Sequence, residues 1–362
     1  MEIEKTQTKN KKPIPEDHGL GFGQYTTDHM FLMDFTAEKG WHRPRIVPYS
    51  NLSLDPAAMI FHYNQEVFEG LKAYSLPDTD IGLFRPEKNL ERLNRSAKRM
   101  VMPTVPKAYF LQALKELILI DRDWVPTTAG TSLYIRPTMI ATEAALGVRP
   151  SKNYLFYIIL SPVGAYYPQG FNPTRIFVSD DYVRAVQGGA GEAKTSGNYG
   201  PTLYVSKEAA ANGYAQVLWL DGKKNKYVEE VGTSNIFFHL NNELITPPIN
   251  GTILPGITRD SVLHLAREWG LPVSERRISI EEVVQGIEDG SLKEVFASGT
   301  AAVISPVGEI GYRGTDRRIA DGQTGDLARR FYEEITGIQY GRKPDPFGWR
   351  RLLSELVSER KR

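Results

Sequence analysis

The glycine-rich segment 188–200 holds one lysine among small side chains. It reads Gly-Gly-Ala-Gly-Glu-Ala-Lys-Thr-Ser-Gly-Asn-Tyr-Gly, with Lys194 at its centre. A lysine amine forms Schiff bases with carbonyl compounds, and it becomes nucleophilic where desolvation or a neighbouring cation lowers its pKa. The small neighbours leave room for a bulky group beside the amine. Most lysines are solvated surface charges, so this segment alone assigns no function.

The same segment permits a second interpretation, a degenerate phosphate-binding loop of a nucleotide-binding protein. From Gly188 to Thr195 it departs from the Walker pattern at one place, because Ala193 stands where a glycine is required. The residues after Thr195, Ser-Gly-Asn-Tyr-Gly-Pro, break the helix that such a loop must open. This context disfavours the nucleotide-binding interpretation.

Two further segments could bind an anion. Segment 254–270 opens with Leu-Pro-Gly-Ile-Thr and has helical apolar spacing that ends at Gly270. The amides of Ile257 and Thr258 at such a helix start, together with the helix dipole, would suit a phosphate. Segment 298–302, Ser-Gly-Thr-Ala-Ala, follows a strand-like run and offers consecutive amides for an anionic oxygen. A capped surface helix and an ordinary strand end would give the same patterns.

A tyrosine and an arginine, Tyr134 and Arg136, are two residues apart in a strand-like run. Alternate residues of a strand share one face, so the phenol and the guanidinium could hold a carboxylate together. Chance alternation on a protein surface would look similar.

The elements that must position these groups fall into two halves. In the first half, strand-like runs at 82–85 and 154–160 alternate with helical spacing at Leu90, Leu93 and Ala97, which predicts a mixed α/β domain. The second half has short strand-like runs at 216–220 and 235–240, followed by the turn signals Asp221-Gly222 and Asn241-Asn242.

A stretch rich in Gly, Pro and Asn, 166–174, separates the two halves. We therefore predict an α/β domain at residues 1–168, a linker at 169–181 and an α+β, barrel-like domain at 182–362. The tail after Gly341 is expected to form a terminal surface helix.

Composition limits the class of protein. The chain has 362 residues, enough for two domains, with 41% hydrophobic and 24% charged residues, as in average soluble proteins. The formal charge of +1 gives no sign of a nucleic-acid partner. The chain has no cysteine, and its six histidines form no short-range metal-binding pair, so no metal site is expected. The N-terminus lacks a signal or transit pattern, and we expect a cytoplasmic protein without membrane spans.

Taken together, the motifs resemble the branched-chain aminotransferases of the class IV, fold-type IV family, which use pyridoxal 5′-phosphate (PLP). The resemblance runs from about Phe22 to Gly341, and its further motifs are Tyr63-Asn-Gln-Glu-Val-Phe-Glu-Gly-Leu-Lys-Ala-Tyr74, Phe84-Arg-Pro, Asn89-Leu-Glu-Arg-Leu93, Ser161-Pro-Val-Gly and Glu230-Val-Gly-Thr-Ser-Asn235. It implies a small N-terminal α/β domain and a larger C-terminal α+β pseudo-barrel that binds PLP.

The resemblance also implies roles for single residues. Lys194 would bind the cofactor covalently and act as the catalytic residue, and Glu230 would pair with the pyridine nitrogen and keep the ring protonated. Arg92 would bind the phosphate, and Tyr199 would hydrogen-bond the phenolic oxygen. Thr233 follows the glycine that lies near the ring. The other expected cofactor-binding residues are Gly232, Leu254, Gly256, Ile257, Thr258, Gly299 and Thr300.

For the substrate, the resemblance implies an aromatic box beside groups that hold carboxylates. Its expected members are Phe22, Tyr63, Phe68, Tyr134, Arg136, Tyr166 and Ala301. Val148 resembles a pocket residue that the partner subunit supplies, which implies a homodimer. Animal members carry a Cys-x-x-Cys after the Ser-Gly-Thr-Ala segment; here Ala302 and Ser305 stand at those places, which rules out a thiol switch there.

The expected activity is transamination of leucine, isoleucine and valine with 2-oxoglutarate, giving branched 2-oxo acids and glutamate. A D-amino acid aminotransferase or an aminodeoxychorismate lyase of the same fold would share the cofactor residues but differ in its substrate pocket. These two activities are the alternatives.

Overall fold

The computed structural model describes residues 2–164 and 171–356. Its contacts divide the chain into two compact units, of which unit 1 is Met1–Tyr166, Ala193–Ser196 and Gly337–Arg362, and unit 2 is Tyr167–Glu192 and Gly197–Thr336. This division assigns Ala193–Ser196, which include Lys194, and the C-terminal segment to unit 1. The boundaries at 168 and 182 and the size order remain predictions from the sequence.

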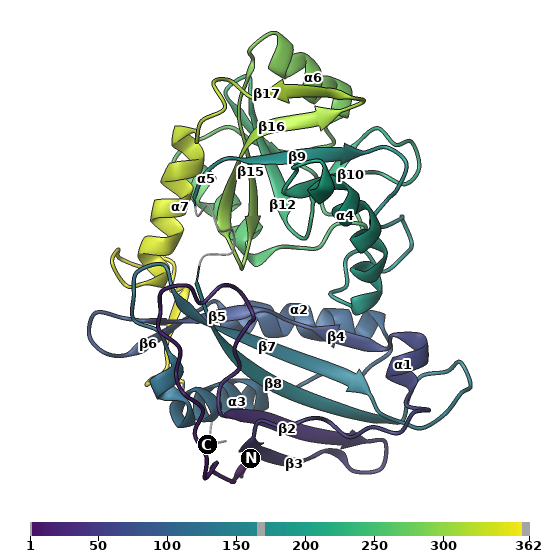
Figure 1. Cartoon of the computed structure of the whole chain (residues 1–362), viewed down its shortest axis with the longest axis vertical. Coiled ribbons are helices and arrows are strands. Elements are labelled where there is room, and N and C mark those ends of the chain that lie inside the picture. Colours follow the sequence, from purple (N-terminus) through teal and green to yellow (C-terminus); the bar gives the residue numbers. More distant parts are fainter. Residues whose placement is uncertain (1, 165–170, 357–362) are drawn as a thin grey trace. The chain divides into compact units, whose positions relative to one another are not determined.

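Unit 1 contains a nine-stranded sheet (Figure 1) in the order β1-β3-β2-β8-β7-β5-β6-β18, with β4 paired to β7. All neighbours are antiparallel except β1 and β3. The strands are β1 (Glu4–Lys5), β2 (His29–Thr36), β3 (Gly40–Pro48), β4 (Glu66–Phe68), β5 (Leu71–Ser75), β6 (Ile81–Phe84), β7 (Ser132–Ala141), β8 (Asn153–Val163) and β18 (Arg350–Leu352). The helices are α1 (Met59–Tyr63), α2 (Pro86–Arg99), α3 (Lys107–Ile120) and the 3₁₀ turn η1 (Arg122–Trp124).

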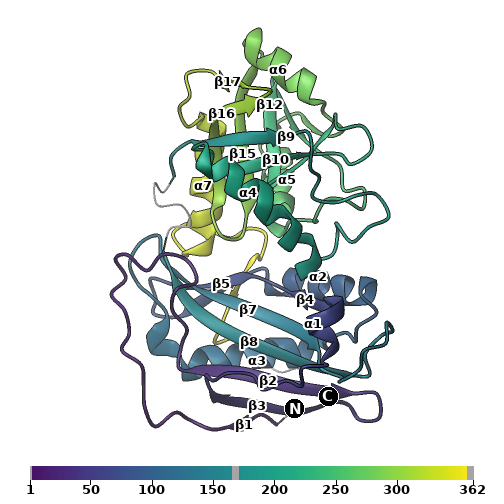
Figure 2. The ribbon, with the colours of Figure 1, turned by 45° about the vertical axis from the view of Figure 1, so that its right-hand side comes forward.

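Strand alternation sends side chains to the two faces of this sheet. Phe31 of β2 belongs to the main core, and its neighbour Leu32 belongs to a smaller cluster with Ile140 of β7. Leu90 and Leu93 of α2 pack into the main core, which also contains residues of α3. Figure 2 shows the ribbons of both helices beside the sheet of unit 1. The helix predicted from this apolar spacing is therefore confirmed.

Unit 2 contains a second nine-stranded sheet in the order β11-β10-β9-β16-β15-β12-β13-β14, with β17 paired to β16. It mixes parallel pairs (β9 with β10 and β16, β13 with β14) with antiparallel ones. The strands are β9 (Thr174–Ser179), β10 (Gln216–Leu220), β11 (Val228–Val231), β12 (Asn235–Leu240), β13 (Glu243–Thr246), β14 (Val273–Glu275), β15 (Leu292–Gly299), β16 (Val303–Tyr312) and β17 (Thr315–Arg318).

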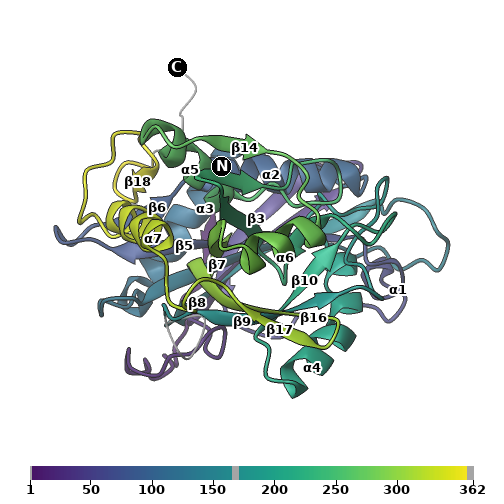
Figure 3. The same cartoon turned by 90° about the horizontal axis from the view of Figure 1, so that it is seen from above.

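The helices of unit 2 pack on both faces of its sheet (Figure 3). They are α4 (Leu203–Ala211), α5 (Ile257–Glu268), α6 (Ile280–Glu288) and α7 (Asp326–Gln339), whose last residues belong to unit 1, together with the 3₁₀ turns η2 (Ser196–Asn198) and η3 (Gly200–Thr202). Leu218 of β10 packs with Ile280 and Val283 of α6, whereas its neighbour Val217 packs with Val205 of α4. This alternation gives the unit two apolar layers.

Several expected elements are present, and two are not. Strands β10 and β12 have the predicted bounds, and Asn241 and Asn242 both have positive φ in the two-residue turn between β12 and β13. The predicted linker 169–181 is wrong in part, because Thr174–Ser179 form β9, whose Ile176 and Val178 are buried. The expected terminal helix is wrong for the described residues, because Arg350–Leu352 pair with β6 as strand β18.

No helix in the described part of the chain is long and apolar enough to cross a membrane. Within the same residues, no group of three or more His, Cys, Asp or Glu side chains could hold a metal ion.

Candidate active site

Lys194 lies in unit 1, anchored by its backbone. Its amide donates to the Ser96 hydroxyl (2.9 Å), and its carbonyl accepts from the Phe68 amide (3.0 Å). The Nζ atom lies 4.9 Å from the centroid of the Phe68 ring. Burial, together with the positive charge of Arg92, lowers the pKa of the Lys194 amine to about 8. About a tenth of this amine is therefore unprotonated and nucleophilic at pH 7, far more than of an ordinary lysine.

Arg92 of α2 is held by a glutamate that the sequence analysis did not single out, Glu69. Arg92 Nε lies 2.7 Å from Glu69 Oε1, and Nη2 lies 2.9 Å from Oε2, which also accepts from Asn89 (2.8 Å). Both partners are buried. Burial alone would raise the pKa of Glu69, but the charge and hydrogen bonds of Arg92 outweigh it, so the pKa is lowered. The available signal was the helical spacing of Asn89 and Arg92, which places both on one face of α2.

Four of the predicted substrate residues gather in unit 1. Arg136 Nη2 donates to the Tyr134 hydroxyl (2.9 Å), and its Cζ lies 4.8 Å from the Phe68 ring centroid. Phe22 meets the Tyr134 ring edge-on, with centroids 4.9 Å apart. A Cβ at Gly70 would lie 2.0 Å from the Tyr134 hydroxyl oxygen, so only glycine fits beside this phenol. Among the described residues, the buried Nε of Arg136 has no hydrogen-bond partner, as expected of a group that binds a carboxylate.

Three other predicted substrate residues are placed differently or not described. Tyr63 ends α1 and donates its hydroxyl to the Leu146 carbonyl. Val148 is 85% exposed, so it lines no pocket within this subunit. Tyr166 lies outside the described residues.

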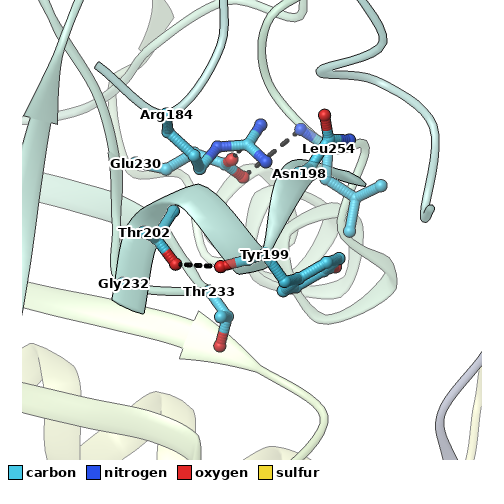
Figure 4. A pocket seen from close by; sticks show the side chains of 8 residues that line it. All are labelled: Arg184, Asn198, Tyr199, Thr202, Glu230, Gly232, Thr233 and Leu254. Atoms are coloured by element: carbon cyan, nitrogen blue, oxygen red, sulfur yellow. Dashed lines mark hydrogen bonds and ion pairs between the residues drawn. The ribbon is translucent and has the colours of Figure 1, made fainter. Parts of the chain in front are cut away.

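Unit 2 has a pocket (Figure 4) around the carboxylate of Glu230, a residue of β11. Five of its lining residues were predicted, Tyr199, Glu230, Gly232, Thr233 and Leu254, and three were not, Arg184, Asn198 and Thr202. Glu230 Oε2 lies 2.6 Å from Arg184 Nη2, and Oε1 accepts from Asn235 Nδ2 (3.1 Å) and the Leu254 amide (3.3 Å). A buried carboxylate with this many donors remains ionised and fixed in direction.

The predicted helix start at Ile257 is confirmed, and Asn235 ties it to the Glu230 pocket. Gly256 is the N-cap of the twelve-residue helix α5, and Thr258 is buried in its first turn. The Asn235 amide group donates to both Glu230 and the Leu254 carbonyl, which precedes the helix. A Cβ at Gly256 would lie 2.0 Å from Asn235 Oδ1, so glycine permits this close approach. The helix presents its first amides as an anion site.

The Ser-Gly-Thr-Ala segment ends β15 with Ser298 and Gly299 and begins the turn to β16 with Thr300 and Ala301. A Cβ on Gly299 would lie 2.9 Å from the Ser234 hydroxyl. The Ser298 hydroxyl is buried without a hydrogen-bond partner among the described residues. Thr300 and Ala301 are partly buried at the turn. Buried polar groups of this kind fit a site that a polar ligand completes.

The nucleotide-binding interpretation of 188–195 is wrong. Thr195 is followed by the 3₁₀ turns η2 and η3, and α4 begins only at Leu203. A phosphate-binding loop needs the helix dipole directly after its lysine and threonine.

An amine of lowered pKa, an arginine ready for a carboxylate, a fixed buried carboxylate and an anion-binding helix start are the groups typical of a transaminating enzyme. Residues 66–310 match the family described as amino-transferase class IV, and the chain belongs to this family.

Individual relatives are close in sequence and structure. The chain is 54% identical to branched-chain-amino-acid aminotransferase 2 of Bacillus subtilis (98% of this chain and 97% of that protein). It is 51% identical to a probable branched-chain-amino-acid aminotransferase of Staphylococcus aureus (98% of each).

The fold of the chain is also similar to solved structures of branched-chain amino acid aminotransferases. The branched-chain amino acid aminotransferase of Escherichia coli superposes with a TM-score of 0.74 at 28% identity (90% of this chain, 99% of that one). A second branched-chain amino acid aminotransferase, solved with pyridoxamine 5′-phosphate, also gives 0.74, at 29% identity (89% and 98%). The predicted fold class, a mixed α/β fold-type IV aminotransferase, is confirmed.

Proposed function

We propose that this protein is a PLP-dependent branched-chain-amino-acid aminotransferase. It transfers the amino group of L-leucine, L-isoleucine or L-valine to 2-oxoglutarate and gives the branched 2-oxo acids and L-glutamate. The observation that carries the proposal is Lys194, an amine whose pKa is lowered to about 8 beside the aromatic ring of Phe68. Relatives at 54% and 51% identity over nearly the whole chain support the same substrates.

The residues present fit PLP. Lys194 would hold its aldehyde carbon, Glu230 its pyridine nitrogen and Tyr199 its phenolic oxygen. Bound PLP supplies an electron sink for the substrate carbanion. Phosphate ligands would be Arg92, Ile257, Thr258 and Thr300, and the remaining contacts would come from Gly232, Thr233, Leu254, Gly256 and Gly299.

The chain's own groups perform the proton transfers. With PLP bound, the free Lys194 amine would accept the α-proton of the amino acid at Nζ and pass it to the former aldehyde carbon of the cofactor, which suits a base whose pKa is lowered to about 8. Glu230 keeps the proton on the pyridine nitrogen, because Arg184 and Asn235 stabilise its ionised form. Arg136 and Tyr134 bind substrate carboxylates, with Arg136 serving the distal carboxylate of 2-oxoglutarate.

The assembly that we propose is a homodimer in which Val148 of each subunit completes the partner's substrate pocket. Val148, Leu146 and Phe61 are 85%, 67% and 60% exposed, and such large apolar side chains favour a protein contact. We also propose a cytoplasmic location, since the chain has no cysteine that needs an oxidising compartment. Sedimentation of Val148→Asp tests the dimer. The variant is expected to be a monomer at a protein concentration at which the wild type is a dimer, and a variant that remains dimeric would contradict the role of Val148.

The test of the activity compares substrates and a lysine variant. The purified protein is expected to show PLP absorbance and to turn over L-leucine rather than D-alanine. Lys194→Ala is expected to lose the covalently bound form of the cofactor. Absence of PLP absorbance, or a covalent form that persists in Lys194→Ala, would refute the proposal. Preferred turnover of D-alanine would instead favour a D-amino acid aminotransferase.

A further inference from the structure

A second buried glutamate adjoins Glu230 in the sequence, and the mechanism above gives it no role. Glu229 and Glu230 are consecutive residues of β11, so their side chains leave opposite faces of the strand. They are 4% and 3% exposed. Two adjacent buried carboxylates would carry two negative charges, but Arg184 is the cation paired with Glu230. Burying a second, unpaired charge would be costly.

The hydrogen bonds around Thr252 decide the protonation state of Glu229. The Thr252 hydroxyl oxygen lies 2.5 Å from Glu229 Oε1 and 2.7 Å from Asn250 Oδ1. Asn250 Oδ1 also accepts from the Thr252 amide (3.2 Å), which identifies this atom as the oxygen of the side-chain amide. A hydroxyl has one proton and can donate to only one of its two neighbours.

The two contacts join three oxygen atoms, Glu229 Oε1, Thr252 Oγ1 and Asn250 Oδ1. Both contacts can be hydrogen bonds only if a second proton is present in addition to that of the hydroxyl. If the Thr252 hydroxyl donates to Asn250, the contact with Glu229 is a hydrogen bond only when the Glu229 carboxyl carries the proton and donates it. In the described part of the chain, the buried Oε2 of Glu229 has no hydrogen-bond partner. A bare carbonyl oxygen of a neutral carboxyl costs far less there than a bare carboxylate oxygen.

Thr252 also connects Glu229 to the Glu230 pocket. Arg184 Nη2 donates to the Thr252 carbonyl (2.5 Å) and to the Gly191 carbonyl (3.0 Å), and its Nη2 is the atom that meets Glu230 Oε2. A Cβ at Gly191 would lie 2.4 Å from the Thr252 carbonyl oxygen, so this packing admits only glycine. One threonine thus contacts Glu229 through its hydroxyl and Arg184 through its carbonyl.

We propose that Glu229 is a neutral carboxyl below neutral pH and acts there as a positioning residue: it leaves the charge of Arg184 to Glu230, which keeps Glu230 ionised toward the cofactor nitrogen. The role toward the cofactor rests on the proposed function. The protonation state of Glu229 does not.

The electrostatic surroundings agree with the geometry. Burial raises the pKa of Glu229 to about 7, and the negative charges of Glu230 on its own strand and Asp221 after β10 act in the same direction. The Thr252 hydrogen bond and the positive charge of Arg184 oppose the shift without cancelling it. Ionisation of Glu229 above pH 7 would add a second negative charge that interacts with both Arg184 and Glu230, so the bound cofactor should sense that titration.

Infrared difference spectroscopy of the full chain without cofactor tests the protonation state directly. At pH 6, Glu229→Gln is expected to lose one protonated-carboxyl C=O band, whereas Glu230→Gln should lose a carboxylate band. The protonated band should fall to half its intensity near pH 7. Loss of a carboxylate band in Glu229→Gln at pH 6 would overturn the proposal.

The holoenzyme tests the coupling. The visible absorbance of bound PLP is expected to show a step centred near pH 7 that Glu229→Gln abolishes. The matched control Glu268→Gln changes an exposed glutamate of α5 and should retain the step. A step that persists in Glu229→Gln would overturn the positioning role, whereas a wild-type protein that binds no PLP would refute the proposed function and leave the infrared result to decide the state of Glu229.

Discussion

Replacement of Glu229 by glutamine should change how the free energy of unfolding depends on pH. In the unfolded chain a glutamate has a pKa of about 4.5, and in the folded protein burial raises the pKa of Glu229 to about 7. Below pH 4.5 the Glu229 carboxyl is protonated in both the folded and the unfolded state, so its ionisation does not affect the free energy of unfolding. Between pH 4.5 and 7 the carboxyl is ionised only in the unfolded state, which stabilises that state, so the free energy of unfolding falls as the pH rises. A difference of about 2.5 pH units at 1.36 kcal/mol each amounts to a loss of about 3 kcal/mol.

Glutamine has the shape of a protonated glutamate and cannot ionise. Its amide can donate to the Thr252 hydroxyl as the carboxyl does, so Glu229→Gln should lack this loss. Relative to wild type, the variant should gain about 3 kcal/mol between pH 4.5 and 8.

Urea denaturation of the cofactor-free protein across this pH range measures the difference. The control is again Glu268→Gln, which replaces an exposed helix residue and should follow the wild-type pH profile. Parallel stability profiles of wild type and Glu229→Gln would show that Glu229 is already ionised in the folded protein, and the reasoning from its hydrogen bonds would be refuted.

Four further outcomes follow from the geometry. Gly232 has φ +55°, a left-handed conformation that strains any residue with a Cβ, and a Cβ there would also displace the end of the Gln216 side chain, so Gly232→Ala should cost about 1–3 kcal/mol in urea denaturation; an unchanged midpoint would contradict this. Phe331 is fully buried, and Phe331→Ala should cost about 3–5 kcal/mol, with a loss below 1 kcal/mol as the refuting result. In the cofactor-free protein, amine-directed labelling of Lys194 should be half-maximal near pH 8 because the pKa is lowered; a midpoint above pH 10 would refute it. Arg136→Met should raise the KM for 2-oxoglutarate at least about tenfold without loss of bound PLP, and equal KM values would remove Arg136 from carboxylate binding.

The sequence alone determined the elements whose signals are local. The Pro-Gly entry and apolar spacing predicted α5 with its start at Ile257, and the dipeptide Asn241-Asn242 marked a turn that needs two positive φ angles. Tyr134 and Arg136 are two residues apart, and strand geometry places them on one face. The roles assigned to Lys194 and Glu230 came from the resemblance to a family and remain proposals.

Only the tertiary structure decided which charges meet. Glu69 with Arg92, and Arg184 with Glu230, are far apart in the chain, and no periodicity links them. The C-terminal tail was expected to be a helix, but the free edge of β6 supplies backbone partners that make Arg350–Leu352 a strand. The protonation state of Glu229 shows most directly what the sequence alone leaves undecided. In the sequence, Glu229 is one of two consecutive glutamates, and nothing there distinguishes it from Glu230. Its protonation depends on burial and on a single threonine hydroxyl that the fold places between the Glu229 carboxyl and the Asn250 side-chain oxygen.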